Sequence, residues 1–291
     1  MQLITLQVQK CGERLCGSAS RLLRLVWFVF ILGGCAPIPE IEVEALPPPL
    51  QSGLVAADGF DLHYVESGAR TLPLVLFVHG TPGSWKAFAR YLNDPRLHER
   101  AHLISVDRPG FGRSVGSGPR PAFVEQSRWI GTLLSQNESA QPAIVVGHSL
   151  GGSLVYQMAL DYPKRVGGVI SISAPVDPSI SRPRWYNQLA RLPGARWIIG
   201  RDLAHSNDEM MPLAEQLQAV STGLPKIKVP VTIVHGAEDG LVKVANASYA
   251  QDQLQSAQVR YRRFEEDGHF IVWERHDEMV AEIERMLNAT L

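Results

Sequence analysis

The sequence predicts an α/β domain in which a mostly parallel sheet is flanked by helices and a helical cap is inserted before the last strands. From Leu54 onward, apolar segments of strand length alternate with helical segments, a pattern typical of parallel sheets covered on both faces. The alternation breaks once, for about 55 residues between Ala174 and Val229, and a structureless loop of that length is improbable inside a compact domain. We therefore expect a sheet core over 51–175 and 230–291 and a helical cap over 176–229.

Each expected element has its own local signal. Asp58-Gly59 between two strand-like runs predicts a hairpin over 54–66, because this dipeptide favours a tight two-residue turn. Short continuous apolar runs predict buried strands, and longer amphipathic segments predict helices. We expect strands at 74–78, 103–106, 143–146, 169–172, 231–234 and 259–264, and helices at 84–92, 123–134, 149–160, 272–287 and, within the cap, near 212–220.

The first 50 residues predict an export signal and a tether. A basic segment precedes an apolar run of about 10 residues from Leu25, which is too short to span a bilayer as a helix. Leu32-Gly33-Gly34-Cys35 resembles the cleavage box of bacterial lipoproteins, and the resemblance implies lipid attachment at Cys35. We expect a signal peptide over 1–34, a proline-rich tether over 35–50, and a lipid-anchored protein of the bacterial cell envelope, at the outer membrane facing the periplasm. An uncleaved anchor is the alternative.

The composition excludes several classes of protein. The chain has 291 residues with 29 acidic and 28 basic side chains, and this balance argues against a nucleic-acid partner. All three cysteines lie in the first 35 residues, so the body has no internal disulfide and no thiolate metal site. Gly110-Phe111-Gly112 lacks the third glycine of a dinucleotide-binding loop. We therefore expect neither a cofactor nor a metal.

A candidate nucleophile lies between a predicted strand and a predicted helix, in Gly147-His148-Ser149-Leu150-Gly151. Gly-x-Ser-x-Gly at such a turn is a nucleophile elbow, which holds the serine hydroxyl at a helix N-terminus where backbone amides favour negative charge. A serine needs a base to take its proton. Two histidines follow the strand at 231–234 and its acidic loop. His269 lies in a turn, whereas His276 lies among charged residues of the last helix and is interpreted as solvent-facing.

From about Leu54 to Leu287 the sequence resembles the α/β-hydrolase family. The matching segments are HGTPG at 79–83, DRPGFGRS at 107–114, GHSLGG at 147–152, HGAED at 235–239 and DGHF at 267–270. The resemblance implies the α/β-hydrolase fold and a triad of Ser149, Asp239 and His269, in the chain order Ser, Asp, His.

The resemblance also implies an oxyanion hole built from the backbone amides of Thr81 and Leu150. Glu238 and Asp177 remain rival acids for the triad. His79 and His148 are interpreted as structural residues that flank the turns, and Asp107 with Arg108 is interpreted as a loop anchor.

The expected function is cleavage of carboxylic esters, either small-molecule esters or lipids, by acyl transfer through Ser149 to water. Relatives that hydrolyse epoxides or haloalkanes carry aspartate at the elbow, so a serine disfavours both. The alternatives are a lipase or thioesterase acting on lipid at the membrane, a cofactor-free haloperoxidase, and a non-catalytic binding protein of the envelope.

The cap contains five arginines beside Trp185, Tyr186 and Trp197. The favoured interpretation is a solvated helix face with its aromatic side chains turned into the pocket. Contact of these residues with lipid headgroups or an anionic substrate is the alternative.

Overall fold

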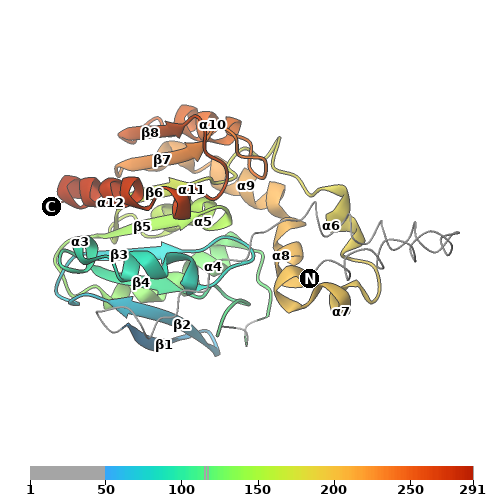
Figure 1. Ribbon diagram of the computed structural model, residues 1–291, viewed down its shortest axis with the longest axis horizontal. Helices are drawn as coiled ribbons and strands as arrows, with labels where there is room; N and C mark the ends of the chain where they lie inside the picture. Colours follow the sequence, from blue (N-terminus) through green and yellow to red (C-terminus); the bar gives the residue numbers. More distant parts are fainter. Residues whose placement is uncertain (1–49, 115, 117, 291) are drawn as a thin grey trace, which may run out of the picture. The chain divides into compact units, whose positions relative to one another are not determined.

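Eight strands form one sheet in the computed structural model, which describes residues 50–114, 116 and 118–290 (Figure 1). The order across the sheet is β1-β2-β4-β3-β5-β6-β7-β8. The bounds are β1 Gln51–Ala57, β2 Phe60–Ser67, β3 Leu74–Val78, β4 His102–Val106, β5 Ala143–His148, β6 Val166–Ile172, β7 Val231–Gly236 and β8 Val259–Phe264. All neighbours from β4 to β8 are parallel, which confirms the predicted fold class.

The antiparallel edge of the sheet is the predicted hairpin. Strand β1 pairs with β2 through the turn at Asp58 and Gly59, where φ is 41° and 92°. Positive φ at both central residues matches the twist of the two strands. Strand β2 then pairs antiparallel with β4, so the hairpin extends the parallel sheet by two strands on one side.

Helices cover both faces of the sheet, as β3 illustrates. Its side chains alternate between two apolar clusters: Leu74, Leu76 and Val78 belong to one, and Val75 and Phe77 belong to the other. One cluster includes residues of α4 Phe123–Ile130, α5 Leu150–Asp161, α9 Leu213–Ser221 and α10 Ala245–Gln253. The other includes residues of η2 Trp85–Phe88, α2 Ala89–Leu92, α3 Pro95–His98, α11 Ile271–Glu274 and α12 His276–Thr290.

Some helix boundaries differ from the expected ones. The helix expected at 84–92 consists of η2 and α2, and the one at 123–134 continues from α4 into η4 Gly131–Gln136. The last helix is divided into α11 and α12 at Arg275, whose φ of −113° and ψ of 50° are not helical. Helix α10 has no counterpart in the prediction, because its inward residues include the small side chains Ala247 and Ala250, which produce little apolar periodicity.

Four helices and a short 3-10 turn occupy the insertion between β6 and β7: α6 Trp185–Leu189, α7 Ala195–Ile199, α8 Arg201–Met210, α9 and η5 Leu224–Lys226. Helix α9 buries Leu213, Leu217 and Val220 in the core, while α6, α7 and α8 lie together at one end of the sheet (Figure 1). The interpretation that the aromatic side chains turn into a pocket is wrong. Trp185 on α6 is 62% exposed and Trp197 on α7 is 93% exposed, and none of the residues of α7 is buried.

The predictions for the N-terminus fall outside the described residues. The signal peptide over 1–34, Cys35 and the tether up to residue 49 all lie there. Among the residues that the structure does describe, no helix is both long enough and apolar enough to cross a membrane.

Candidate active site

Ser149 occupies a strained turn between β5 and α5. Its φ of 54° and ψ of −125° lie outside the regions that non-glycine residues favour. The turn is held by the Ser149 amide, which donates to the Ile172 carbonyl on β6 at 2.8 Å. A Cβ at Gly147 would lie 2.2 Å from the Gly151 carbonyl oxygen, and a Cβ at Gly151 would lie 2.2 Å from the Val78 oxygen. The two glycines therefore let the chain make the turn that presents Ser149.

The loop that follows β3 packs directly against this serine. A Cβ at Gly80 would lie 2.9 Å from the Ser149 Cβ and 3.4 Å from its Oγ, so only a glycine backbone fits there. Thr81 is the next residue, and Leu150 is the first residue of α5, where backbone amides have no partner within the helix. The two amides expected to form the oxyanion hole are therefore carried by segments adjacent to Ser149.

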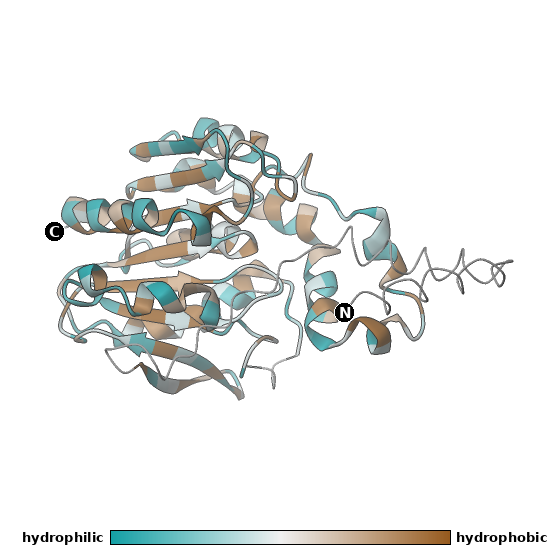
Figure 2. Cartoon of the chain, in the orientation of Figure 1, coloured by the Kyte–Doolittle hydropathy of each residue, from teal (hydrophilic) through white to brown (hydrophobic). Residues whose placement is uncertain are grey.

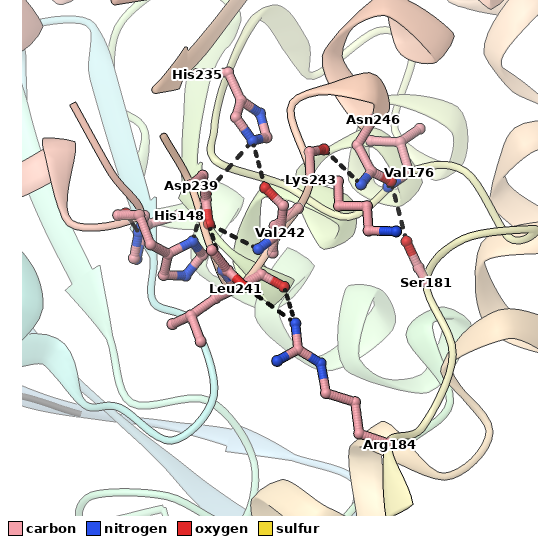
Figure 3. Close-up of polar contacts among 12 residues, drawn as sticks. His148, Val176, Ser181, Arg184, His235, Asp239, Leu241, Val242, Lys243 and Asn246 are labelled. Carbon is pink, nitrogen blue, oxygen red and sulfur yellow. Dashed lines mark hydrogen bonds and ion pairs between the residues drawn. The ribbon is translucent and has the colours of Figure 1, made fainter. Parts of the chain in front are cut away.

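Asp239 and His269 are joined directly. His269 Nδ1 donates to Asp239 Oδ2 at 2.7 Å, and both side chains are buried. Asp239 Oδ1 accepts from the amides of Leu241 at 2.9 Å and Val242 at 2.7 Å. Figure 3 shows this carboxylate surrounded by His235 and the Leu241–Val242 loop. The loop after β7 therefore holds the carboxylate in one orientation, and the proton on Nδ1 leaves Nε2 as the basic nitrogen of His269.

The charge of Asp239 is favoured by its hydrogen bonds. Burial raises the pKa of this carboxyl, but donation from His235 and His269, together with the Val242 amide, outweighs burial and holds the pKa well below its usual range. His235 Nε2 lies 3.4 Å from Asp239 Oδ2, and the same nitrogen donates to the Val242 carbonyl at 2.9 Å. The residue facing His269 is thus a carboxylate at neutral pH.

The rival acids and the second histidine lie elsewhere. Glu238 is exposed beside the buried Asp239, and Asp177 Oδ1 accepts from the amide and hydroxyl of Ser179. The interpretation of His276 as solvent-facing is wrong. It is buried, its ring lies 4.6 Å from that of Tyr91, and its Nε2 bonds to Asp94 Oδ2 at 2.9 Å. Because its neighbours in the sequence are charged, the sequence does not indicate that His276 lies on the inward face of α12.

His148 connects the serine turn to the histidine turn. Its Nε2 donates to the His269 carbonyl at 2.9 Å, and the two ring centroids lie 4.9 Å apart. Burial, together with the neighbouring His269, lowers the pKa of His148 to about 3. His148 is therefore neutral, and it joins Ser149, its sequence neighbour, to the segment that carries His269.

Arg108 links this region to the inserted helices, a connection that sequence reasoning missed. Its Nη1 lies 2.6 Å from Glu209 Oε1, and its Nη2 lies 3.0 Å from Glu209 Oε2 on α8. Nη1 also donates to Gln126 at 2.8 Å, and Nη2 donates to the Gly80 carbonyl at 2.8 Å. Asp107, next in sequence, accepts from His63 and from the amides of Trp85 and Arg113. Asp107 anchors its loop as expected, while Arg108 ties α8 to the Gly80 loop.

Comparison with known proteins agrees with this architecture. The family model described as the alpha/beta hydrolase family matches residues 75–282. Bifunctional epoxide hydrolase 2 of Sus scrofa is 36% identical over 151 residues, which are 48% of this chain and 26% of that protein. The chain therefore spans about a quarter of that relative's length.

Two solved structures share the fold over most of the chain. A membrane phospholipase A described as a bacterial virulence factor has a TM-score of 0.64 and 21% identity, covering 93% of this chain and 98% of that one. The epoxide hydrolase VrEH1 of Vigna radiata has a TM-score of 0.66 and 16% identity, covering 82% and 98%. The match of the family model over most of the chain shows that this protein belongs to the alpha/beta hydrolase family.

Proposed function

We propose that the protein is a serine hydrolase that cleaves carboxylic esters, with Ser149 as nucleophile, His269 as general base and Asp239 as the acid that orients His269. The hydrogen bond between Asp239 and His269, beside the elbow that carries Ser149, is the observation that carries the proposal. A nucleophile, a base and a base-orienting carboxylate are the three parts that acyl transfer through a serine requires.

The chemistry follows from these roles. His269 Nε2 takes the Ser149 proton as Oγ attacks the ester carbonyl, and the amides of Leu150 and Thr81 stabilise the resulting oxyanion. Collapse of the tetrahedral intermediate breaks the ester bond, and the imidazolium returns its proton to the leaving alcohol. Water, activated by the same nitrogen, then hydrolyses the acyl-enzyme and regenerates Ser149.

The residue at the elbow supports an ester rather than an epoxide as substrate. Several relatives are epoxide hydrolases by name. The family resemblance associates that activity with an elbow carboxylate, and position 149 is a serine. A serine oxygen activated by a general base, here His269, is suited to attack on an acyl carbon, so carboxylic esters fit the site best.

Substitution of the nucleophile tests the proposal. Ser149→Ala should abolish both the hydrolysis of p-nitrophenyl esters and labelling by a fluorophosphonate probe, while circular dichroism stays that of the wild type. Ser179→Ala, a serine in an exposed turn, is the matched control and should retain both signals. Normal turnover by Ser149→Ala would refute the assignment.

The N-terminal sequence supports a lipid anchor at Cys35, which we propose holds the protein in the bacterial cell envelope. Metabolic labelling with palmitate should mark the wild-type chain, and Cys35→Ala should abolish the label. Equal labelling of both chains would contradict the anchor and leave the proposed hydrolase activity untouched.

A further inference from the structure

The inserted helices expose apolar side chains that a folded domain ordinarily buries. Helix α7 has the sequence ARWII, and none of its residues is buried. Trp197 is 93% exposed and Ile198 is 78% exposed, and Trp185 and Leu192 are also exposed nearby in the sequence. Figure 2 shows α7 as a mostly hydrophobic helix at the outer end of the insertion. Large apolar residues exposed this close together along the chain point to a surface that contacts another apolar phase or a partner.

The same segment is strongly basic. Residues 182–201 contain five arginines and no acidic residue: Arg182, Arg184, Arg191, Arg196 and Arg201. Two of them pair with acids of α8, Arg196 with Asp208 and Arg201 with Asp202. Within the described part of the chain, no carboxylate forms an ion pair with the exposed Arg182 or Arg191. We call these five arginines, together with Trp185, Leu192, Trp197 and Ile198, the cap face.

The cap face adjoins the candidate active site. Arg184 Nη2 donates to the carbonyls of Gly240 at 3.2 Å and Leu241 at 3.1 Å, as Figure 3 shows for Leu241. These two residues directly follow Asp239 in the loop that holds the carboxylate, and Leu241 is itself exposed. A surface that bound the cap face at Arg184 would therefore lie beside the loop that carries Asp239.

We propose that the cap face docks on an anionic lipid bilayer and that the site takes its ester substrate from that bilayer. The docking is inferred from the cap face alone, whereas the uptake of substrate from the bilayer rests on the proposed function. Tryptophan and isoleucine enter the boundary between headgroups and acyl chains, while arginines at the same level pair with lipid phosphates. This mixture of aromatic, aliphatic and cationic side chains is complementary to an anionic membrane surface.

The charge of the cap face argues against a second copy of this chain as the occupant. A symmetric dimer through this face would set the same arginines against one another, and like charges facing each other across an interface cost several kcal/mol. An anionic bilayer instead supplies the opposite charge over the whole face.

Vesicle binding of full-length protein carrying Cys35→Ala, which removes the acylation site, tests the docking. Trp197→Ala/Ile198→Ala should weaken binding to phosphatidylglycerol vesicles by about tenfold or more, because both side chains lose apolar area buried in the bilayer. The matched control is Leu54→Ala/Val124→Ala, which removes two exposed apolar side chains elsewhere and should bind as before. Equal binding by both double variants would overturn the proposal.

Charge reversal tests the headgroup contact separately. Arg191→Glu should weaken binding to phosphatidylglycerol vesicles by about 30-fold, because it removes one positive charge and adds one negative charge and each charge near an anionic surface is worth about 1 kcal/mol. Binding to phosphatidylcholine vesicles should change little. A loss of equal size on both vesicle types would contradict the electrostatic part. Light scattering should show the same mass for Trp197→Ala/Ile198→Ala and its parent. A parent dimer that this change dissociates would show that a second copy of the chain, and not a bilayer, occupies the cap face.

Activity separates this inference from the proposed function. Trp197→Ala/Ile198→Ala should hydrolyse a soluble p-nitrophenyl ester at the parent rate and lose at least fivefold on an ester lipid in phosphatidylglycerol vesicles, since only the second substrate needs docking. Equal activity of parent and variant on both substrates would overturn delivery from the bilayer. No activity of the parent on either substrate would instead overturn the proposed function, whatever the vesicle binding.

Discussion

The buried ion pair between Arg108 and Glu209 offers a direct test of how the inserted helices are held to the sheet. Arg108 lies in the loop after β4, Glu209 lies on α8, and the side chains are 0% and 1% exposed. The guanidinium centre also lies 4.9 Å from the centroid of the Phe111 ring. Glu209→Ala removes the one carboxylate that pairs with Arg108 in the described structure and leaves Gln126 and the Gly80 carbonyl as neutral acceptors.

The magnitude follows from this burial. Breaking a buried pair from one side leaves an uncompensated charge and costs about 3–5 kcal/mol of unfolding free energy. For a domain of this size that loss lowers the melting temperature by about 6–20 °C. Arg108→Met/Glu209→Leu removes both charges, and replacement of a buried pair by apolar groups is often close to neutral. The double variant should therefore be more stable than Glu209→Ala.

Guanidinium unfolding followed by circular dichroism measures these differences, and Arg108→Met, Glu209→Leu and Arg108→Met/Glu209→Leu, together with the wild type, form the double-mutant cycle. A loss below about 1 kcal/mol for Glu209→Ala would show that water or another group compensates Arg108, which would refute the reasoning. A double variant as unstable as the sum of the two single variants would show that the two residues are not coupled. Ester turnover measured on the same samples would report whether the loss of Glu209 disturbs the Gly80 loop through Arg108.

Three further outcomes are expected. Gly151→Ala should prevent soluble folding or lower stability by about 3 kcal/mol or more, because its Cβ would lie 2.2 Å from the backbone oxygen at the end of β3, whereas Gly240→Ala, with open space around its Cβ, should express normally. Asp239→Asn should lower kcat by about 10³–10⁴-fold, since the amide disturbs the tautomer and charge that the base needs, and Glu238→Gln should retain activity; similar losses in both variants would contradict the choice of acid. Burial lowers the pKa of His148 to about 3, below the ordinary value of about 6.5. As the pH falls, His148 therefore becomes protonated in the unfolded chain before it does so in the folded protein. The free energy of unfolding should decline between about pH 6.5 and pH 3, by about 1.4 kcal/mol per pH unit. His148→Gln should flatten the dependence of unfolding free energy on pH in that window, and an unchanged slope would contradict it.

Local pattern was sufficient for much of the fold, and short motifs that resemble the α/β-hydrolase family pointed to the candidate site residues. The run at 74–78 is apolar at every position, which indicates a strand buried on both faces, and β3 has that character. The glycines around Ser149 specify the elbow because only they fit a turn this tight. The segments carrying Thr81, Asp239 and His269 were selected because each is a short motif that follows an expected strand and resembles a segment of the α/β-hydrolase family. All of these signals lie within a few consecutive residues, so an amino-acid sequence displays them directly.

Contacts between distant segments could not be read in this way. Glu209 gave no signal of its role, because it meets Arg108 across 101 positions. His276 was misread because its charged neighbours describe the outer face of α12, while Asp94 and Tyr91 contact its inner face. The direction of the cap aromatic side chains differs from the expectation for the same reason: a hydrophobic residue implies burial only if another element covers it, and Trp185 and Trp197 are left largely uncovered. Periodicity along a chain encodes which side chains share a face, whereas the element that this face meets depends on packing among segments far apart in sequence.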